Sequence, residues 1–138
     1  MDAETTPKSP EAVRATEAER AAKVRSIMAY TTGTEAYHRL SLAPLNCTDS
    51  IKYIAEAVGA FWLVEAVACE YTRPRAQEYR DFLVVEFHVE PGGRAWIHLR
   101  PDTGAQSVAT QEIPFTDFPV GLWKFYIVDG VLMCPGDY

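Results

Sequence analysis

Histidines, carboxylates, arginines and a tryptophan gather in one predicted hairpin, between Phe82 and Arg100. Both arms alternate apolar and polar residues, as half-buried strands do. A three-residue turn, Pro91-Gly92-Gly93, pairs Glu90 with Arg94 and places the aliphatic residues on one face. The polar face then carries Glu86, His88, Arg94, Trp96, His98 and Arg100, with Glu86 opposite His98 and His88 opposite Trp96.

Two kinds of function are compatible with this polar face. Two histidines beside Glu86 can bind a metal ion or move protons, which describes a small metal-dependent or general acid/base enzyme. Tryptophan and arginine instead anchor protein interfaces, and Trp96 beside Arg94 and Arg100 suits binding better than catalysis. The simplest alternative is a solvated sheet surface with cross-strand charge pairs. A further alternative is that an N-terminal helix folds over the face.

A second polar cluster is predicted where the central helix begins. Tyr37, His38, Arg39 and Asp49 can converge there. If a carboxylate holds His38 in one tautomer, general-base chemistry becomes conceivable. The alternative is a histidine whose hydrogen bond only fixes a loop. The sequence offers no clear nucleophile, because the nearby Cys47 has no identified partner.

Common catalytic signatures are absent from the sequence. It contains no nucleophile elbow, phosphate-binding loop, dinucleotide fingerprint or zinc-binding His-Glu-x-x-His helix. Cys47, Cys69 and Cys134 are odd in number and far apart, which disfavours a disulfide framework or zinc site and favours a reducing compartment. We therefore expect no cofactor and no metal, and assign no catalytic residue.

Composition and charge exclude further classes of protein. The chain is 48% hydrophobic and 23% charged, as globular proteins are, and its net charge of −6 disfavours direct binding to nucleic acid. No apolar run reaches the ~18 residues of a membrane span, and the N-terminus has no apolar signal core. These features predict a cytoplasmic protein that does not bind membranes.

An N-terminal helix is predicted from Pro10 to about Tyr30, after a polar and disordered stretch over residues 1–8. Its apolar face is thin, because its large apolar residues are few and lie mostly near its C-terminal end. We therefore expect residues 1–30 to form a mobile segment and a helical arm. The arm would dock near its C-terminal end or on a partner, including a second copy of the chain.

The remaining elements indicate the fold class. Residues 49–71 have helical periodicity, with a bend at Gly59 and with Glu65 as an acid that needs a buried partner. Strands follow, the last two joined by the hairpin dipeptide Asp129-Gly130. Helices first and strands afterwards predict an α+β fold, with N-terminal helices packed on one face of an antiparallel meander sheet of about five strands. Residues 31–138 would form this single domain.

Several short motifs occur in a fixed order between Thr32 and Tyr138. They are Thr32-Gly33-Thr34-Glu35, Tyr37-His38-Arg39, Thr48-Asp49, Tyr53-Ile54-Ala55-Glu56, Gly59-Ala60-Phe61-Trp62-Leu63, Pro114-Phe115-Thr116-Asp117-Phe118-Pro119 and Pro135-Gly136-Asp137-Tyr138. The set resembles a family of small bacterial proteins of unknown function, met in genomes, plasmids and phages. The resemblance implies no activity. The link of this family to mobile elements implies that its members are accessory proteins, which bind and modulate host machinery.

The function predicted from the sequence is therefore non-catalytic binding of a protein partner, through the Trp96 face, the arm or both. A specific form is a mobile-element protein that inhibits a host nuclease or defence complex, with its acids blocking a nucleic-acid groove. The alternative is the small enzyme that uses Glu86, His88 and His98. A third possibility is a homodimer held by the arm.

Overall fold

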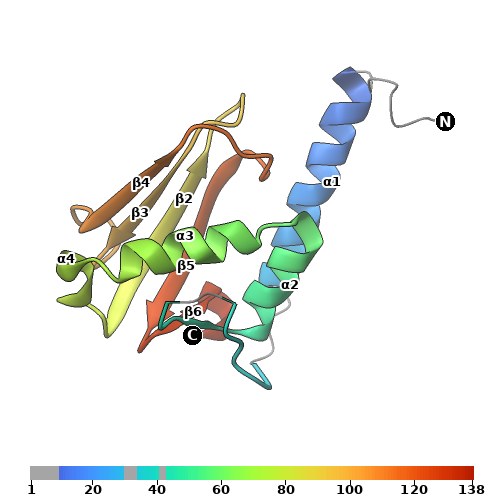
Figure 1. The fold of residues 1–138 in the computed structure, drawn as a ribbon. Coiled ribbons are helices and arrows are strands. Elements are labelled where there is room, and N and C mark those ends of the chain that lie inside the picture. The colour runs from blue at the N-terminus through green and yellow to red at the C-terminus, as the bar shows by residue number, and fades with distance from the viewer. Residues whose placement is uncertain (1–9, 30–33, 41–42) are drawn as a thin grey trace.

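The computed structural model describes residues 10–29, 34–40 and 43–138 (Figure 1). The predicted disorder of residues 1–8, and the predicted helix end near Tyr30, lie outside these residues. The helices are α1 (Pro10–Ala29), α2 (Asp49–Val58), α3 (Phe61–Tyr71), α4 (Pro74–Gln77) and the short 3₁₀ helix η2 (Pro135–Asp137). The strands are β1 (Asn46–Cys47), β2 (Phe82–Val89), β3 (Ala95–Arg100), β4 (Ala109–Ile113), β5 (Gly121–Val128) and β6 (Val131–Met133).

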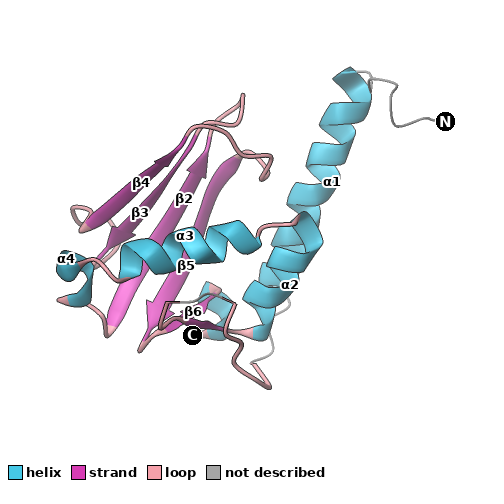
Figure 2. Cartoon of the chain, viewed as in Figure 1, coloured by secondary structure: helices cyan, strands magenta, loops and turns pink. Residues whose placement is uncertain are grey.

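The predicted α+β class is confirmed, and α3 crosses one face of the sheet (Figure 2). The prediction of about five strands in an antiparallel meander is wrong. The sheet has six strands in the order β1-β6-β5-β2-β3-β4, and β1 pairs with β6 in parallel. β1 escaped prediction because two residues show no alternation. β5 does not lie beside β4, as a meander would require. It pairs with β2 instead, and the two eight-residue strands pair along their whole length.

The predicted register of the β2–β3 hairpin is confirmed. The Glu90 N–H donates to the Arg94 carbonyl oxygen at 2.8 Å, and His88 faces Trp96 across the pair. Gly93 closes the turn with a φ of +97°. Its carbonyl oxygen accepts a 2.8 Å hydrogen bond from the Thr116 N–H, which ties the turn to the loop before β5.

The predicted helix over residues 49–71 is divided into α2 and α3 at Gly59. Gly59 has a φ of 65° and its N–H bonds back to Ala55, which ends α2 in a left-handed cap. The break changes which side of α3 faces the sheet. Glu65, expected to be buried, is therefore exposed, and Glu70 is the buried acid, paired with Arg73 at 2.8 Å.

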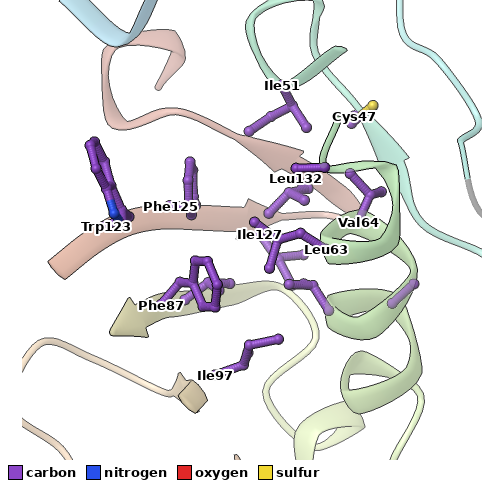
Figure 3. Close-up of a cluster of buried hydrophobic side chains, with 14 of the residues drawn as sticks. Cys47, Ile51, Leu63, Val64, Phe87, Ile97, Trp123, Phe125, Ile127 and Leu132 are labelled. Atoms are coloured by element: carbon purple, nitrogen blue, oxygen red, sulfur yellow. The ribbon is translucent and has the colours of Figure 1, made fainter. Parts of the chain in front are cut away.

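One hydrophobic core lies between the helices and the sheet. Figure 3 shows Leu63 and Val64 of α3 facing Phe87 and Ile127 of the sheet. Phe118, from the loop before β5, is buried and stacks edge-on against Phe87. These side chains and α3 lie on one face of the sheet, and on the opposite face Tyr138 packs against Phe82 and Tyr126.

The described side chains of α1 attach it to this core. Ala21 and Val24 are buried, and Arg20 donates to the Val58 carbonyl oxygen at 3.2 Å and to the Asp117 carbonyl oxygen at 2.6 Å. The second half of α1 therefore docks within the chain itself. No helix of the described residues combines the length and hydrophobicity needed to cross a membrane.

Candidate functional site

The predicted hairpin residues lie on the sheet face turned away from α3. The register of β2 with β3 and β5 places Leu122, His88 and Trp96 in one row across this face. Lys124, Glu86 and His98 form the next row. We call the surface made by these residues, together with Arg94, Arg100, Thr110 and Glu112, the open face.

The ring of Trp96 is contacted by two neighbours on the open face. The Arg94 guanidinium carbon lies 4.9 Å from the centroid of its ring, and the His88 ring is tilted against it at 6.1 Å. Arg94 is held in turn by Glu112, with 2.8 Å between Nη2 and Oε2. Leu122, in the same row, is 65% exposed. The row therefore runs from the exposed Leu122 through His88 to a tryptophan ring that two neighbours contact.

The groups that were candidates for acid/base or metal chemistry are engaged with neighbours. Arg100 Nε donates to Glu86 Oε1 at 2.7 Å, and its Nη1 donates to the Ala105 carbonyl oxygen. His98 Nδ1 lies 3.1 Å from the Ser107 hydroxyl. Burial, followed by the positive charge of Arg100, lowers the pKa of His98 below its usual value. Within the described part of the chain, no three His, Cys, Asp or Glu residues are grouped to hold a metal ion.

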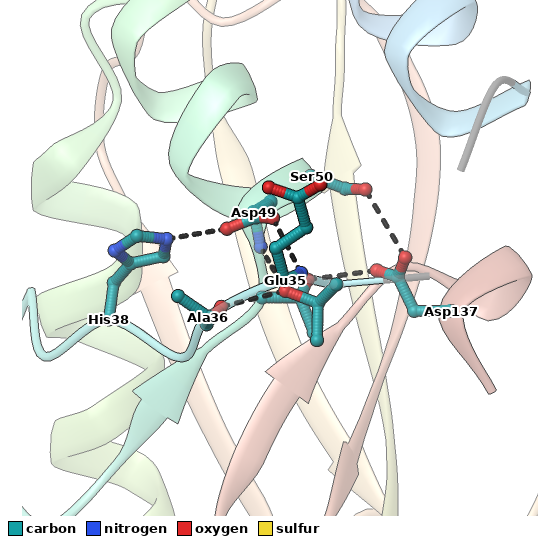
Figure 4. A network of polar contacts seen from close by, with 8 residues as sticks. Glu35, Ala36, His38, Asp49, Ser50 and Asp137 are labelled. Atoms are coloured by element: carbon teal, nitrogen blue, oxygen red, sulfur yellow. Dashed lines mark hydrogen bonds and ion pairs between the residues drawn. The ribbon is translucent and has the colours of Figure 1, made fainter. Parts of the chain in front are cut away.

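The second predicted cluster is partly assembled (Figure 4). His38 Nε2 lies 2.6 Å from Asp49 Oδ1, and the Glu35 N–H donates to Asp49 Oδ2 at 2.9 Å. The Glu35 N–H, followed by His38, lowers the pKa of Asp49. Tyr37 and Arg39 are exposed and make no hydrogen bond or ion pair with Asp49. The structure therefore brings together two of the four predicted residues.

A carboxylate that sequence reasoning missed lies beside this cluster. Asp137 accepts hydrogen bonds from the Thr48 hydroxyl at 2.8 Å, the Ser50 hydroxyl at 3.2 Å and the Cys134 N–H at 3.0 Å. These contacts place a negative charge at the start of α2, where the helix dipole favours it. No sequence spacing relates Asp137 to Thr48, so only the Pro-Gly-Asp turn could have marked it.

Neither buried cysteine is prepared as a nucleophile for the His38–Asp49 pair. Cys47 and Cys134 are buried, and burial raises their thiol pKa values to about 11 and about 12. Both thiols are therefore protonated at neutral pH, whereas a nucleophilic cysteine reacts as thiolate. The described contacts of His38 and Asp49 join the loop before α2 to the start of that helix. Both predicted roles of His38, as a general base and as a histidine that fixes a loop, stay predictions.

A groove runs between α1 and the loop before β5. Its volume is about 460 Å³, and its walls include Glu17, Arg20, Gly93 and Phe115. Phe115 is 71% exposed at its rim. Because α1 forms one wall of the groove, a partner that binds α1 there would also contact the loop before β5.

Comparison with known proteins gives one relationship. No curated protein and no solved structure matches the chain significantly. Residues 22–138 match DUF6876, a family of unknown function. The match covers the predicted region of resemblance, from about Thr32 to Tyr138. It also includes residues 22–29 of α1, among them the buried Val24. The chain therefore belongs to DUF6876, and the resemblance predicted from its motifs is confirmed.

Proposed function

We propose that this protein acts without catalysis, by binding another protein through the open face. The observation that carries the proposal is Trp96, whose ring is contacted by Arg94 and His88, with the exposed Leu122 on the far side of His88. Interfaces obtain most of their binding energy from a few aromatic and arginine side chains. A ring that is already fixed loses little conformational entropy when a partner covers it.

The charges of the open face favour a protein partner over a nucleic acid. Arg94 and Arg100 are neutralised by Glu112 and Glu86, at 2.8 Å and 2.7 Å. A surface that binds phosphates needs cations that are free to replace counterions. The open face combines these paired charges with the apolar surface of Trp96 and Leu122, and protein interfaces likewise combine polar and apolar area.

The same pairs bear on how an inhibitor would work. Our proposal includes a mobile-element accessory protein that inhibits a host nuclease or defence complex. An inhibitor that blocks a nucleic-acid groove by imitating phosphates needs clustered, unpaired acids. Glu86 and Glu112 are paired, so the open face favours direct docking on a protein surface.

The second candidate function is the small metal-dependent or general acid/base enzyme. The 2.6 Å contact between His38 and Asp49 is the observation in its favour, because a carboxylate orients a general base in this way. The hairpin version, with Glu86, His88 and His98, has less support, because Glu86 is bound to Arg100 and His98 to Ser107.

Affinity capture of the tagged full chain from its native cells tests the proposal. We expect one stoichiometric partner, lost or weakened at least about 30-fold by Trp96→Ala, the effect of a strong interface anchor. Tyr53→Ala is the matched control, since Tyr53 is a 54% exposed aromatic on α2. The proposal fails if the partner is retained by Trp96→Ala. It also fails if the purified protein carries stoichiometric metal that His88→Ala removes.

A further inference from the structure

The two edges of the sheet differ. At the first edge, the chain covers β1: the His38 N–H donates to the Cys47 carbonyl oxygen and the Cys47 N–H donates to that of His38, both at 2.8 Å. The other edge is β4, which pairs only with β3 (Figure 1). Among the residues that the structure describes, no backbone hydrogen bond forms on the outer side of β4.

The hydrogen-bond alternation shows which groups of β4 face outward. The hydrogen bond from Glu90 to Arg94 makes these two residues a hydrogen-bonded pair. Counting along β3 in steps of two, the backbone groups of Trp96, His98 and Arg100 therefore also point toward β2. The intervening residues, among them Ile97, are therefore directed toward β4, where Ile97 faces Gln111. It follows that the N–H and C=O groups of Thr110 and Glu112 point away from the sheet.

We propose that two copies of this chain pair through β4, antiparallel, about a two-fold axis that passes beside Gln111. In this register Thr110 of each copy faces Glu112 of the other, and their outward groups exchange four backbone hydrogen bonds. On the open face, each Thr110 hydroxyl can donate to the facing Glu112 carboxylate. Thr–carboxylate neighbours of this kind are favourable cross-strand pairs, as hydrogen-bonded pairs generally are.

Adjacent registers are less favourable. An axis at Glu112 would set the two Glu112 carboxylates directly opposite each other, which is repulsive. An axis at Thr110 would set Gln111 opposite the small Ala109 and leave its amide without a polar neighbour. Only the axis at Gln111 places amide beside amide, at a position where the strands approach most closely because that pair exchanges no backbone bonds.

Gln111 supplies an independent reason for a second copy. Its Oε1 is buried and has no hydrogen-bond donor among the described residues. A buried acceptor without a donor is destabilising, and native structures retain few. Across the axis, the amide of the second copy brings a donor within reach, and the relationship is reciprocal because each amide carries both a donor and an acceptor.

β4 also lacks three of the features that commonly keep edge strands apart. Edges are commonly protected by lysine, by proline or by an unpaired charge. The sequence of β4 contains neither lysine nor proline, and its one charge, on Glu112, is paired with Arg94. The axis runs perpendicular to the sheet, so the open faces of both copies point the same way. The two Trp96 anchors then lie about 16 Å apart, from three strand spacings and a two-residue offset.

Sedimentation equilibrium of the full chain tests the pairing. We expect twice the mass of one chain at about 100 µM, where a micromolar Kd populates the dimer. Thr110→Pro removes an outward N–H and leaves the bonds to β3 intact, so it should give a monomer with an unchanged circular dichroism spectrum. Thr110→Val keeps the N–H and should remain dimeric. A monomeric wild type, or a dimeric Thr110→Pro, overturns the proposal.

Disulfide trapping tests the register without relying on the proline variant. In a background with Cys69→Ser, which removes the exposed thiol, Gln111→Cys should form an intermolecular disulfide on mild oxidation. Directly opposed residues that exchange no backbone bonds are close enough to bridge. Thr110→Cys should not, because the two copies of residue 110 are offset. Equal trapping at both positions, or none at Gln111→Cys, overturns the register.

Discussion

Replacing Gly93 by alanine tests how tightly the β2–β3 turn packs on the loop before β5. Gly93 has a φ of +97°, and a methyl group there would lie 2.6 Å from the Phe115 ring and 2.8 Å from the Thr116 carbonyl oxygen. Gly92 is the matched control. It has a φ of +98°, but a methyl group there would meet nothing within 4 Å. Comparing the two variants separates steric contact from backbone strain.

The expected magnitudes follow from these two terms. An alanine at such a φ costs about 1–3 kcal/mol at either position. Overpacking adds about 1–3 kcal/mol at Gly93 alone. Phe115 is exposed and its ring can turn away, but Thr116 is tied to Gly93 by its own 2.8 Å hydrogen bond. We expect the free energy of unfolding to fall by about 1–3 kcal/mol for Gly92→Ala and by about 2–6 kcal/mol for Gly93→Ala.

Urea denaturation followed by tryptophan fluorescence measures both variants under the same conditions. Adding Phe115→Ala to Gly93→Ala should recover only a small part of the loss, because the Thr116 carbonyl oxygen remains in contact. If Gly92→Ala and Gly93→Ala agree within about 0.5 kcal/mol, about the limit of such comparisons, the loop does not restrict the turn and the tight packing of Gly93 on Thr116 is wrong.

Three other predictions concern the region around α2 and the thiols. Folding lowers the pKa of Asp49. The Asp49 carboxylate therefore stabilises the fold above its unfolded pKa of about 3.9, and this contribution is lost as the pH falls through the folded pKa. The urea midpoints of the wild type and of Asp49→Asn should differ at pH 7 and converge in acid. Asp137→Ala should lower the free energy of unfolding by about 2–4 kcal/mol, because it leaves donors unpaired, whereas the exposed Glu78→Ala should change it by less than about 0.5 kcal/mol. A thiol-reactive dye should label Cys69 rapidly, and the buried cysteines only after denaturation; fast labelling of all three would contradict the burial of Cys47 and Cys134.

The sequence was most informative where structure is set by neighbouring residues. The β2–β3 hairpin was predictable in detail, because period-two alternation and a glycine turn determine its register locally. The dipeptide Asp129-Gly130 likewise marked the β5–β6 turn, where both residues have positive φ. The position of His88 opposite Trp96 followed from that register, so the residue pattern alone was enough to locate the centre of the candidate site.

Features set by distant residues could not be predicted. The left-handed conformation of Gly59 decides whether Glu65 or Glu70 is buried, and a glycine in a helical pattern does not reveal its φ. The contacts of Asp137 with the start of α2 join residues almost ninety positions apart. β1 is recognisable only through its partner β6. Each of these depends on tertiary packing, which local patterns do not record.

The position of β5 beside β2 has a consequence for how the chain folds during synthesis. β2 is made well before β5, yet its whole length on that side pairs with β5. Until residues 121–128 are available, the eight residues of β2 have no partner on that side, and α3 covers an incomplete sheet. The parallel pairing of Asn46 with Val131 must come later still. Such non-local pairing slows folding, so a nascent or truncated chain should depend on chaperones until its last strands emerge.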